Sequence, residues 1–304
     1  MDVAQILKEI EPVAGRLLDR HMGVAKEWFP HEMVPYDRGK NFSPGEQWVP
    51  TDADFGDAGI EIDEPVRDAL FLNLLTEDNL PYYFRDIDRL FGRESAYGVW
   101  ARNWTAEEGR HSIVMRDYMT VSRAVDPVAL ERARMIQVRG GEVPDPGDAI
   151  EALAYVSMQE LATRISHRYT GKLMKDEIGT AIMSRVGNDE NLHYLFYRDL
   201  TSAALEVDPS TTVIGIERAV RNFAMPGTGI PDYERMAREI AKAGIYDLLI
   251  HHDQILEPVV MRHWKVTELT GLTAEAEQAR DALVKRIERT AKVGKRLAAE
   301  RVDA

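Results

Sequence analysis

Two short segments of the sequence repeat the same pair of metal-binding side chains. Each reads Glu-x-x-His, at Glu108–His111 and at Glu190–His193. Residues three apart on an α-helix face the same side, about 4.5 Å apart along the axis. One carboxylate and one imidazole in that arrangement can bind the same metal ion. A single such pair often arises by chance, so the repetition is what indicates a metal site.

A lone glutamate precedes each pair at nearly the same spacing. Glu77 lies 31 residues before Glu108, and Glu160 lies 30 residues before Glu190. In antiparallel helices joined by a turn, such positions come to the same height. The complete pattern on four helices is the ligand set of ferritin-like carboxylate bundles that bind two metal ions. Four carboxylates and two neutral imidazoles suit iron or manganese and leave positions open for dioxygen.

The alternative is that these glutamates face solvent and that both histidines are ordinary helix residues. The local sequences argue against it, because Glu160 lies within ALAYVSMQELATRIS and Glu77 follows LFLNLL. Such apolar flanks predict burial, and buried carboxylates are very costly without compensating cations. We therefore predict one buried site for two metal ions, with six ligands: Glu77, Glu108, His111, Glu160, Glu190 and His193.

The elements that must position this site are helices. Apolar residues recur at helical spacing along most of the chain, and strand signals are scarce. We expect an all-α fold with a ferritin-like four-helix bundle core and flanking helices, in a single domain over 1–304. The predicted ligand helices cover about 64–90, 96–125, 149–169 and 177–205, and loops are predicted at 140–148 and 222–232.

Composition limits the classes of function. The chain has 304 residues, with 38 Lys and Arg, 51 Asp and Glu, and a net charge of −13, which argues against a nucleic-acid binder. It has no cysteine, so disulfides and thiolate metal sites are excluded. No apolar run is long enough to span a membrane, and the start lacks the pattern of a signal peptide. We expect a cytoplasmic protein.

Six segments carry a resemblance to a known family: TEDNLPYY (76–83), RNWTAEEGRHS (102–112), SMQELATRISHR (157–168), GNDENLHYLFYRD (187–199), FAMPG (223–227) and RHWKVTELTGLTAEAEQARD (262–281). In these segments the chain resembles the soluble acyl-acyl carrier protein desaturases, especially the actinobacterial members. The resemblance spans most of the chain from about residue 20 to 300. It implies that the six predicted ligands hold two iron ions.

The resemblance also implies roles for three residues near the metals. Thr163 matches a threonine on the oxygen-binding side of the cluster, although a helix-interior threonine that bonds a preceding carbonyl explains it equally well. Asp189 matches an acidic residue that hydrogen-bonds a ligand histidine, here His111. Trp48 matches a tryptophan at the outer end of that path from the surface, or else it anchors a loop.

The resemblance further implies two acidic protein partners, an acyl carrier protein bearing the substrate and a ferredoxin-type electron donor, and a homodimer. A local basic surface would suit acidic partners. The segment from Arg280 to Arg301 has eight Lys and Arg against three Asp and Glu. Four of its residues form one helical stripe, which is one candidate partner surface unless it is simply a solvated helix face: Lys285, Arg289, Lys292 and Arg296. An earlier basic patch is the second candidate, with the same alternative: Arg16, Arg20, Lys26, Arg38 and Lys40.

Three other functions remain compatible with the same ligand set. A hydroxylase or oxidase of carrier-bound chains would use the same metals, an iron-storage protein would share the bundle, and a weakly active paralogue would bind carrier protein only. Gly109 and Gly187 lie within two predicted ligand helices, where glycine lowers helix stability by about 1 kcal/mol relative to alanine. These glycines either loosen the site or make room for a neighbouring group.

Overall fold

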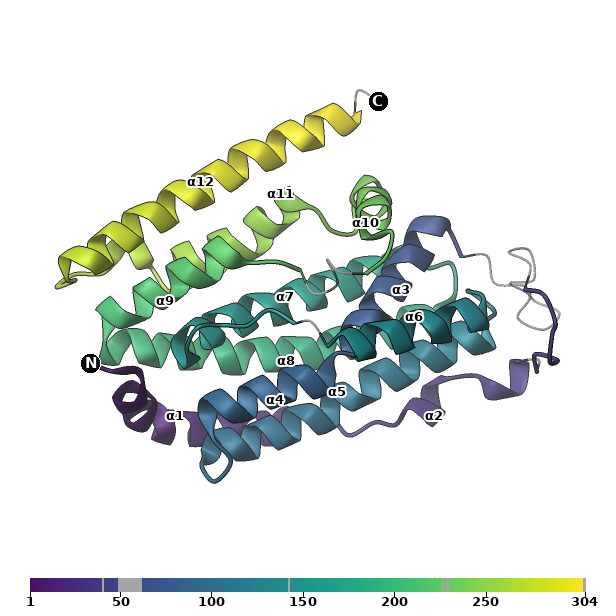
Figure 1. Cartoon of the computed structure of the whole chain (residues 1–304), viewed down its shortest axis with the longest axis horizontal. Helices are drawn as coiled ribbons and strands as arrows, with labels where there is room; N and C mark the ends of the chain where they lie inside the picture. The colour runs from purple at the N-terminus through teal and green to yellow at the C-terminus, as the bar shows by residue number, and fades with distance from the viewer. Residues whose placement is uncertain (40, 49–61, 142, 226, 228–229, 303–304) are drawn as a thin grey trace.

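A computed structural model describes residues 1–39, 41–48, 62–141, 143–225, 227 and 230–302. Within these ranges the chain is helical and contains no strand (Figure 1), which confirms the all-α prediction. The α-helices are α1 (Val3–Val24), α2 (Pro30–Met33), α3 (Glu64–Glu77), α4 (Leu80–Phe91), α5 (Ala96–Val121), α6 (Pro127–Gly140), α7 (Ala149–Leu173), α8 (Glu177–Val207), α9 (Pro209–Asn222), α10 (Tyr233–Lys242), α11 (Leu248–His251) and α12 (Ala274–Val302). A π-helix follows α11 over His252–His263, and two short 3-10 helices span Tyr36–Arg38 and Val266–Glu268. None of these described helices is both long and apolar enough to cross a membrane.

Short polar residues define where several helices begin. The Asp148 carboxylate accepts hydrogen bonds from the backbone N–H groups of Ile150 and Glu151, both at 2.9 Å, and so caps α7. Asp126 caps α6 in the same way, and a proline follows it at the first helical position. Thr273 accepts the N–H of Ala276 at the start of α12.

The predicted helix over 64–90 is in fact two helices. α3 ends at Glu77, and α4 begins at Leu80 after a turn through Asp78 and Asn79. Pro81 in the first turn of α4 explains the break, because proline has no N–H to donate to the carbonyl oxygen of Glu77 and its ring clashes with that carbonyl in a continuous helix. Glu77 is therefore the last residue of its helix, beside a turn.

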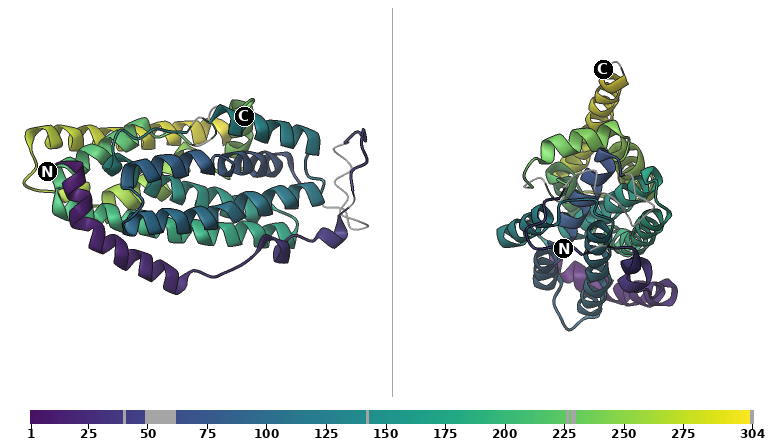
Figure 2. Two further views of the ribbon diagram at one scale, coloured as in Figure 1. Left: turned by 60° about the horizontal axis from the view of Figure 1, so that its bottom comes forward. Right: turned by 90° about the vertical axis from the view of Figure 1, so that its right-hand side faces the viewer.

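Four helical rods form the central bundle, and the remaining helices cover it. α3 with α4, α5, α7 and α8 run side by side along the long axis (Figures 1 and 2). α7 and α8 make the most extensive contact in the molecule. α1 packs against α5 and α8 on one side, whereas α9 packs on α7 and carries α12 on the opposite side.

The apolar interior consists of two separate cores. On α5, Trp100 and Trp104 belong to one core, and Met115 and Tyr118 belong to the other. α8 repeats this division, with its N-terminal half in the second core and its C-terminal half in the first. The segments between the two cores on both helices carry the predicted ligands. The bundle therefore encloses a polar layer between two apolar blocks.

The two glycines on the ligand helices have different surroundings. A methyl group added at Gly109 would meet no atom within 4 Å outside its own helix backbone. A methyl group at Gly187 would lie 3.0 Å from the Cγ of Arg168 on α7 and 3.5 Å from the carbonyl oxygen of Arg164. Gly187 thus allows α7 and α8 to approach closely, whereas packing does not explain Gly109.

The two alanine variants should therefore differ in stability. Gly109→Ala is expected to stabilise the fold by about 1 kcal/mol, because it gains helix propensity at no steric cost. Gly187→Ala should gain less or lose stability, because the new methyl group crowds Arg168. Chemical denaturation of both variants and the parent measures the difference. A larger gain for Gly187→Ala would contradict this account of the packing.

Candidate metal centre

The structure brings the six predicted ligand residues together in the polar layer. Glu77 comes from α3, Glu160 from α7, and one Glu-x-x-His pair each from α5 and α8. None of the six residues is more than 8 % exposed. Their donor atoms form two overlapping groups, in each of which all atoms lie within 4.8 Å of one another. The spacing argument therefore located the cluster correctly.

The first group surrounds His111. Its Nδ1 lies 3.0 Å from Glu108 Oε2, 3.5 Å from Glu190 Oε1 and 3.8 Å from Glu77 Oε2. One imidazole nitrogen and three carboxylate oxygens thus converge from α3, α5 and α8. This is a mixed nitrogen and oxygen set of the kind that binds iron or manganese.

The second group surrounds His193. Its Nδ1 lies 2.8 Å from Glu108 Oε1, 3.6 Å from Glu160 Oε2 and 4.0 Å from Glu190 Oε2. Glu108 and Glu190 belong to both groups, and each turns one oxygen toward each histidine. Glu108 and Glu190 would therefore help to hold both ions, whereas Glu77 and Glu160 would each help to hold one.

The unpaired atoms of this layer fit metal ions. Glu108 Oε1, Glu160 Oε2 and His193 Nδ1 are buried and form no hydrogen bond with any described residue. Buried polar atoms are normally paired, and all three atoms belong to the second group. The two groups supply the donor types that two divalent cations need, and the six residues named above would hold them.

The pKa shifts of the ligand side chains also indicate a site that requires positive charge. Burial and the charge of Glu108 raise the pKa of Glu77 to about 8. Burial and neighbouring carboxylates raise the pKa of Glu160 well above its usual range. Burial alone lowers the pKa of His111 and His193, but carboxylates, first of all Glu108, outweigh it and raise both pKa values. Protons therefore compensate the buried negative charge unless cations displace them.

Asp189 supports the outer side of His111. Its Oδ2 lies 3.5 Å from His111 Nε2 and accepts a 2.7 Å hydrogen bond from the indole N–H of Trp28. Arg110 and Arg185 contact the same carboxylate, and both guanidinium groups lie over the Trp28 ring. Asp189 therefore lies beside His111 Nε2, although that nitrogen forms no hydrogen bond with a described residue, and His111 Nδ1 faces the first group of donor atoms.

The tryptophan of this path is not the one predicted from the sequence. Trp48 donates its indole N–H to the carbonyl oxygen of Arg123 at 3.1 Å and lies near Arg67, away from Asp189. Trp28 occupies the predicted place because the segment between α1 and α2 brings its indole N–H within hydrogen-bonding distance of Asp189. The assignment of Trp48 to this path was therefore wrong, and its contact with Arg123 fits the loop-anchor alternative.

Glu107 is a second supporting carboxylate that sequence reasoning missed. Its Oε2 lies 2.8 Å from His193 Nε2 and 3.0 Å from Nε2 of His21, a buried residue of α1. Each ligand histidine therefore has an outward carboxylate that can accept its Nε2–H and leave Nδ1 for the metal. The doubled Glu in TAEEGRH was the available signal.

Thr163 borders the site without touching a ligand side chain. Its hydroxyl donates to the carbonyl oxygens of Glu160 and Gln159, at 3.0 and 3.2 Å, as expected of a helix-interior threonine. It also lines a cavity of about 10 Å³ together with Glu77 and Glu108. Both readings of Thr163 are therefore compatible with its position.

The charge of the cluster predicts how metal binding depends on pH. A cation must displace the proton of Glu77, whose pKa is about 8, so ferrous affinity should rise as pH increases from 6 to 8. Each proton released changes the affinity by about tenfold per pH unit. Calorimetric binding in buffers of different ionisation enthalpy measures the proton release. An affinity that is constant over this pH range would contradict the assignment.

Comparison with known proteins identifies the family of this chain. A model of the fatty acid desaturase family matches residues 2–304. An acyl-[acyl-carrier-protein] desaturase of Mycobacterium tuberculosis, DesA1, is 39 % identical over 92 % of this chain and 83 % of its own length. A chloroplastic stearoyl-[acyl-carrier-protein] 9-desaturase of Gossypium hirsutum is 29 % identical over 92 % of this chain and 73 % of its own.

The fold also matches a solved structure. The X-ray structure of the acyl-ACP desaturase DesA2 from Mycobacterium tuberculosis superposes with a TM-score of 0.69, at 24 % identity, over 90 % of this chain and 99 % of that one. This likeness supports the helical architecture, and the family match covers nearly the whole sequence. The chain therefore belongs to the fatty acid desaturase family.

Proposed function

We propose that this protein introduces a cis double bond into a saturated acyl chain carried on acyl carrier protein. The observation that carries this proposal is the buried layer of four carboxylates and two histidines, in a chain whose relatives are named acyl-[acyl-carrier-protein] desaturases. We propose two iron ions as the cofactor, dioxygen as the oxidant and a ferredoxin-type protein as the electron donor. The homodimer and the single domain remain predictions.

The overall reaction balances with these reactants. Two adjacent methylenes lose two hydrogens, and one dioxygen takes up these two hydrogens, two electrons and two protons to form two waters. When bound, the iron pair would activate dioxygen for this oxidation. The protein's residues hold the ligands in place, support the outer nitrogens of His111 and His193, and exclude bulk water through the two apolar cores.

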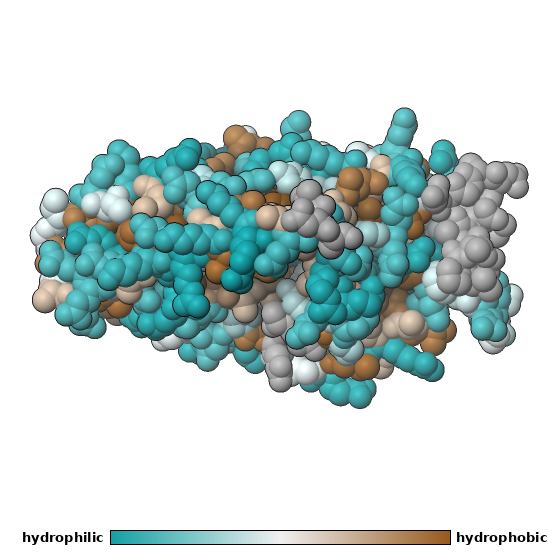
Figure 3. Space-filling view, turned by 90° about the horizontal axis from the view of Figure 1, so that it is seen from above, coloured by the Kyte–Doolittle hydropathy of each residue, from teal (hydrophilic) through white to brown (hydrophobic). Residues whose placement is uncertain are grey.

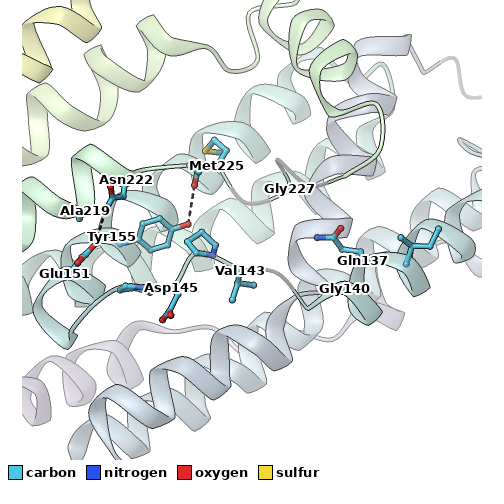
Figure 4. A pocket seen from close by; sticks show the side chains of 14 residues that line it. Gln137, Gly140, Val143, Asp145, Glu151, Tyr155, Ala219, Asn222, Met225 and Gly227 are labelled. Atoms are coloured by element: carbon cyan, nitrogen blue, oxygen red, sulfur yellow. Dashed lines mark hydrogen bonds between the residues drawn. The ribbon is translucent and has the colours of Figure 1, made fainter.

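Hollows along α7 provide a path for an acyl chain. The cavity beside Glu77 and Thr163 shares Tyr83, Trp104 and Gln159 with a second cavity of about 30 Å³. That cavity shares Pro144, Pro146 and Tyr155 with a surface pocket of about 490 Å³ (Figure 4). The inner cavities hold about one water each, so side chains must move to admit an alkyl chain.

A second pocket links this region to α12. It has a volume of about 510 Å³, lies between α9, α10, α11 and α12, and shares Met225 with the first surface pocket. Apolar side chains such as Phe223 and Leu297 line it, and Arg238 and Arg286 lie at its margin. An apolar chain with a charged head would suit such a pocket, so we propose it as the side from which carrier protein presents the substrate.

The predicted basic stripe lies on the same helix. All four stripe residues are exposed: Lys285, Arg289, Lys292 and Arg296. Of these four, only Arg296 forms an ion pair with a described residue, which is Glu300. Figure 3 looks onto the face that carries α12 and shows mostly hydrophilic side chains with apolar patches between them. We propose the stripe as the docking surface for the acidic carrier protein.

Product analysis tests the proposed reaction. Iron-loaded protein is incubated with stearoyl and palmitoyl carrier protein, dioxygen and a reduced ferredoxin system, and the acyl products are analysed by mass spectrometry. We expect a mono-unsaturated product, two mass units lighter than the substrate. Glu160→Gln should abolish it at unchanged fold, because one metal position loses its own carboxylate. A hydroxylated product, or no product from iron-loaded protein, would contradict the proposal.

Charge reversal tests the docking surface. Replacing the four stripe residues by glutamate should raise the KM for acyl carrier protein by about tenfold or more and leave kcat unchanged, because the stripe steers binding and does not touch the reacting atoms. The effect should shrink as salt is added. The control reverses two exposed cations elsewhere, Lys8 on α1 and Arg132 on α6. If the stripe variant and the control variant had equal KM values, the docking surface for carrier protein would lie elsewhere.

A further inference from the structure

A third buried histidine faces the metal-binding layer, and neither the spacing pattern nor the family resemblance assigned it a role. His167 on α7 is fully buried. Its Nε2 lies 3.4 Å from Glu77 Oε1 and 3.4 Å from Glu190 Oε1. At these distances Nε2 forms no hydrogen bond with any described residue. These two oxygens belong to the carboxylates around His111.

The outward partner of His167 differs in kind from those of the ligand histidines. His193 Nε2 lies 2.8 Å from Glu107 Oε2, and His111 Nε2 faces Asp189 Oδ2 at 3.5 Å without a formed hydrogen bond. In both cases a carboxylate is placed to accept the hydrogen of Nε2 and to leave a lone pair on the inward Nδ1. His167 turns Nδ1 toward the side-chain amide of Asn73, whose Nδ2 lies 3.2 Å away. In His167, therefore, Nε2 faces the metal-binding layer and Nδ1 faces outward, the reverse of the two ligand histidines, and the outer partner is an amide.

The amide orientation of Asn73 determines which nitrogen of His167 carries hydrogen. The hydroxyl of Ser166 donates to Asn73 Oδ1 at 3.1 Å, so the NH₂ group faces the imidazole. An N–H that points at Nδ1 requires a lone pair there, and the neutral ring then carries its hydrogen on Nε2. A doubly protonated ring would require the Asn73 amide to turn its oxygen toward Nδ1, but that ring also carries hydrogen on Nε2. The inward nitrogen is therefore a donor in both states.

We propose that His167 is a positioning residue, which donates its Nε2–H to Glu77 and Glu190 and holds these carboxylates in ligand geometry at the His111 position. It is not a third imidazole ligand, because an Nε2 that carries hydrogen has no lone pair for a metal. Consistently, its ring nitrogens are absent from both groups of mutually close donor atoms. The inference rests on the metal centre that the proposed function uses.

The other metal position has a different support. Glu160 accepts a 3.1 Å hydrogen bond from the indole N–H of Trp104. The carboxylate donors are therefore His167 for Glu77 and Trp104 for Glu160. Removal of either donor should weaken one metal position and spare the other.

Ferrous binding isotherms, recorded anaerobically by near-infrared circular dichroism, test this role without any turnover. His167→Leu should weaken one of two binding steps by about 10–100-fold, the usual cost of losing an outer support, and leave the other within about threefold. His167→Gln should bind like the parent, because its amide N–H can replace Nε2–H. Trp104→Phe should weaken the other step.

Two further variants keep the test decisive. If His167→Leu does not fold, His167→Asn should show the same loss, because its shorter amide reaches Asn73 but not the carboxylates. Thr170→Val is the matched control, a buried residue one turn away that bonds only the carbonyl oxygen of Ser166, and both its steps should be unchanged.

Two results would overturn the proposal. Parent-like ferrous binding by His167→Leu would show that the imidazole does not position the carboxylates. A loss of ferrous affinity in His167→Gln equal to that in His167→Leu would show a ligand or packing role instead. A parent protein that binds two ferrous ions but forms no alkene would contradict the proposed reaction and leave this inference standing. A parent that binds no ferrous ion would overturn both.

Discussion

The burial of four carboxylates in one layer is the constraint on which the rest of the structure depends. Removing several negative charges from water is strongly unfavourable unless positive charge compensates them. The protein supplies His111 and His193 within the layer and His167 beside it, and burial with neighbouring carboxylates still raises the pKa values of Glu77 and Glu160. Two divalent cations would replace the protons and complete the balance.

The fold meets this constraint by arranging supports outside the layer. Two apolar cores on either side exclude water, and close contact of α7 with α8 holds the helices that carry Glu160 and Glu190. Elements from outside the bundle also take part. α1 contributes His21, which contacts Glu107, and the segment after it contributes Trp28, which contacts Asp189. The covering helices therefore help to orient both ligand histidines.

The ligand cluster was predictable from the sequence because helix geometry is local. Glu-x-x-His places two side chains on one face, and the similar spacings from Glu77 and Glu160 follow from helix length. The break after Glu77 was missed, although Pro81 signals it, because the apolar pattern continues across the turn. Long helices with strong periodicity and clear caps, such as the one that begins after Asp148, came out correctly.

The supports were harder to predict because they depend on contacts between segments far apart in the chain. Trp28 and Trp48 both precede the bundle, and only the path of the chain over Asp189 distinguishes them. His167 lies seven residues after Glu160, two helical turns along the same face, but its role depends on Asn73 from α3. No sequence spacing encodes which nitrogen of an imidazole faces a neighbour.

The most direct test of the central claim is the number of ferrous ions bound per chain, measured with the change in thermal stability on binding. Anaerobic loading followed by removal of free iron and elemental analysis should give two ions per chain. The unfolding midpoint should rise by roughly 5–10 °C, because cations that bind only the folded chain stabilise it. Protein that retains no iron and unfolds at an unchanged temperature would show that the buried carboxylates are compensated by protons alone.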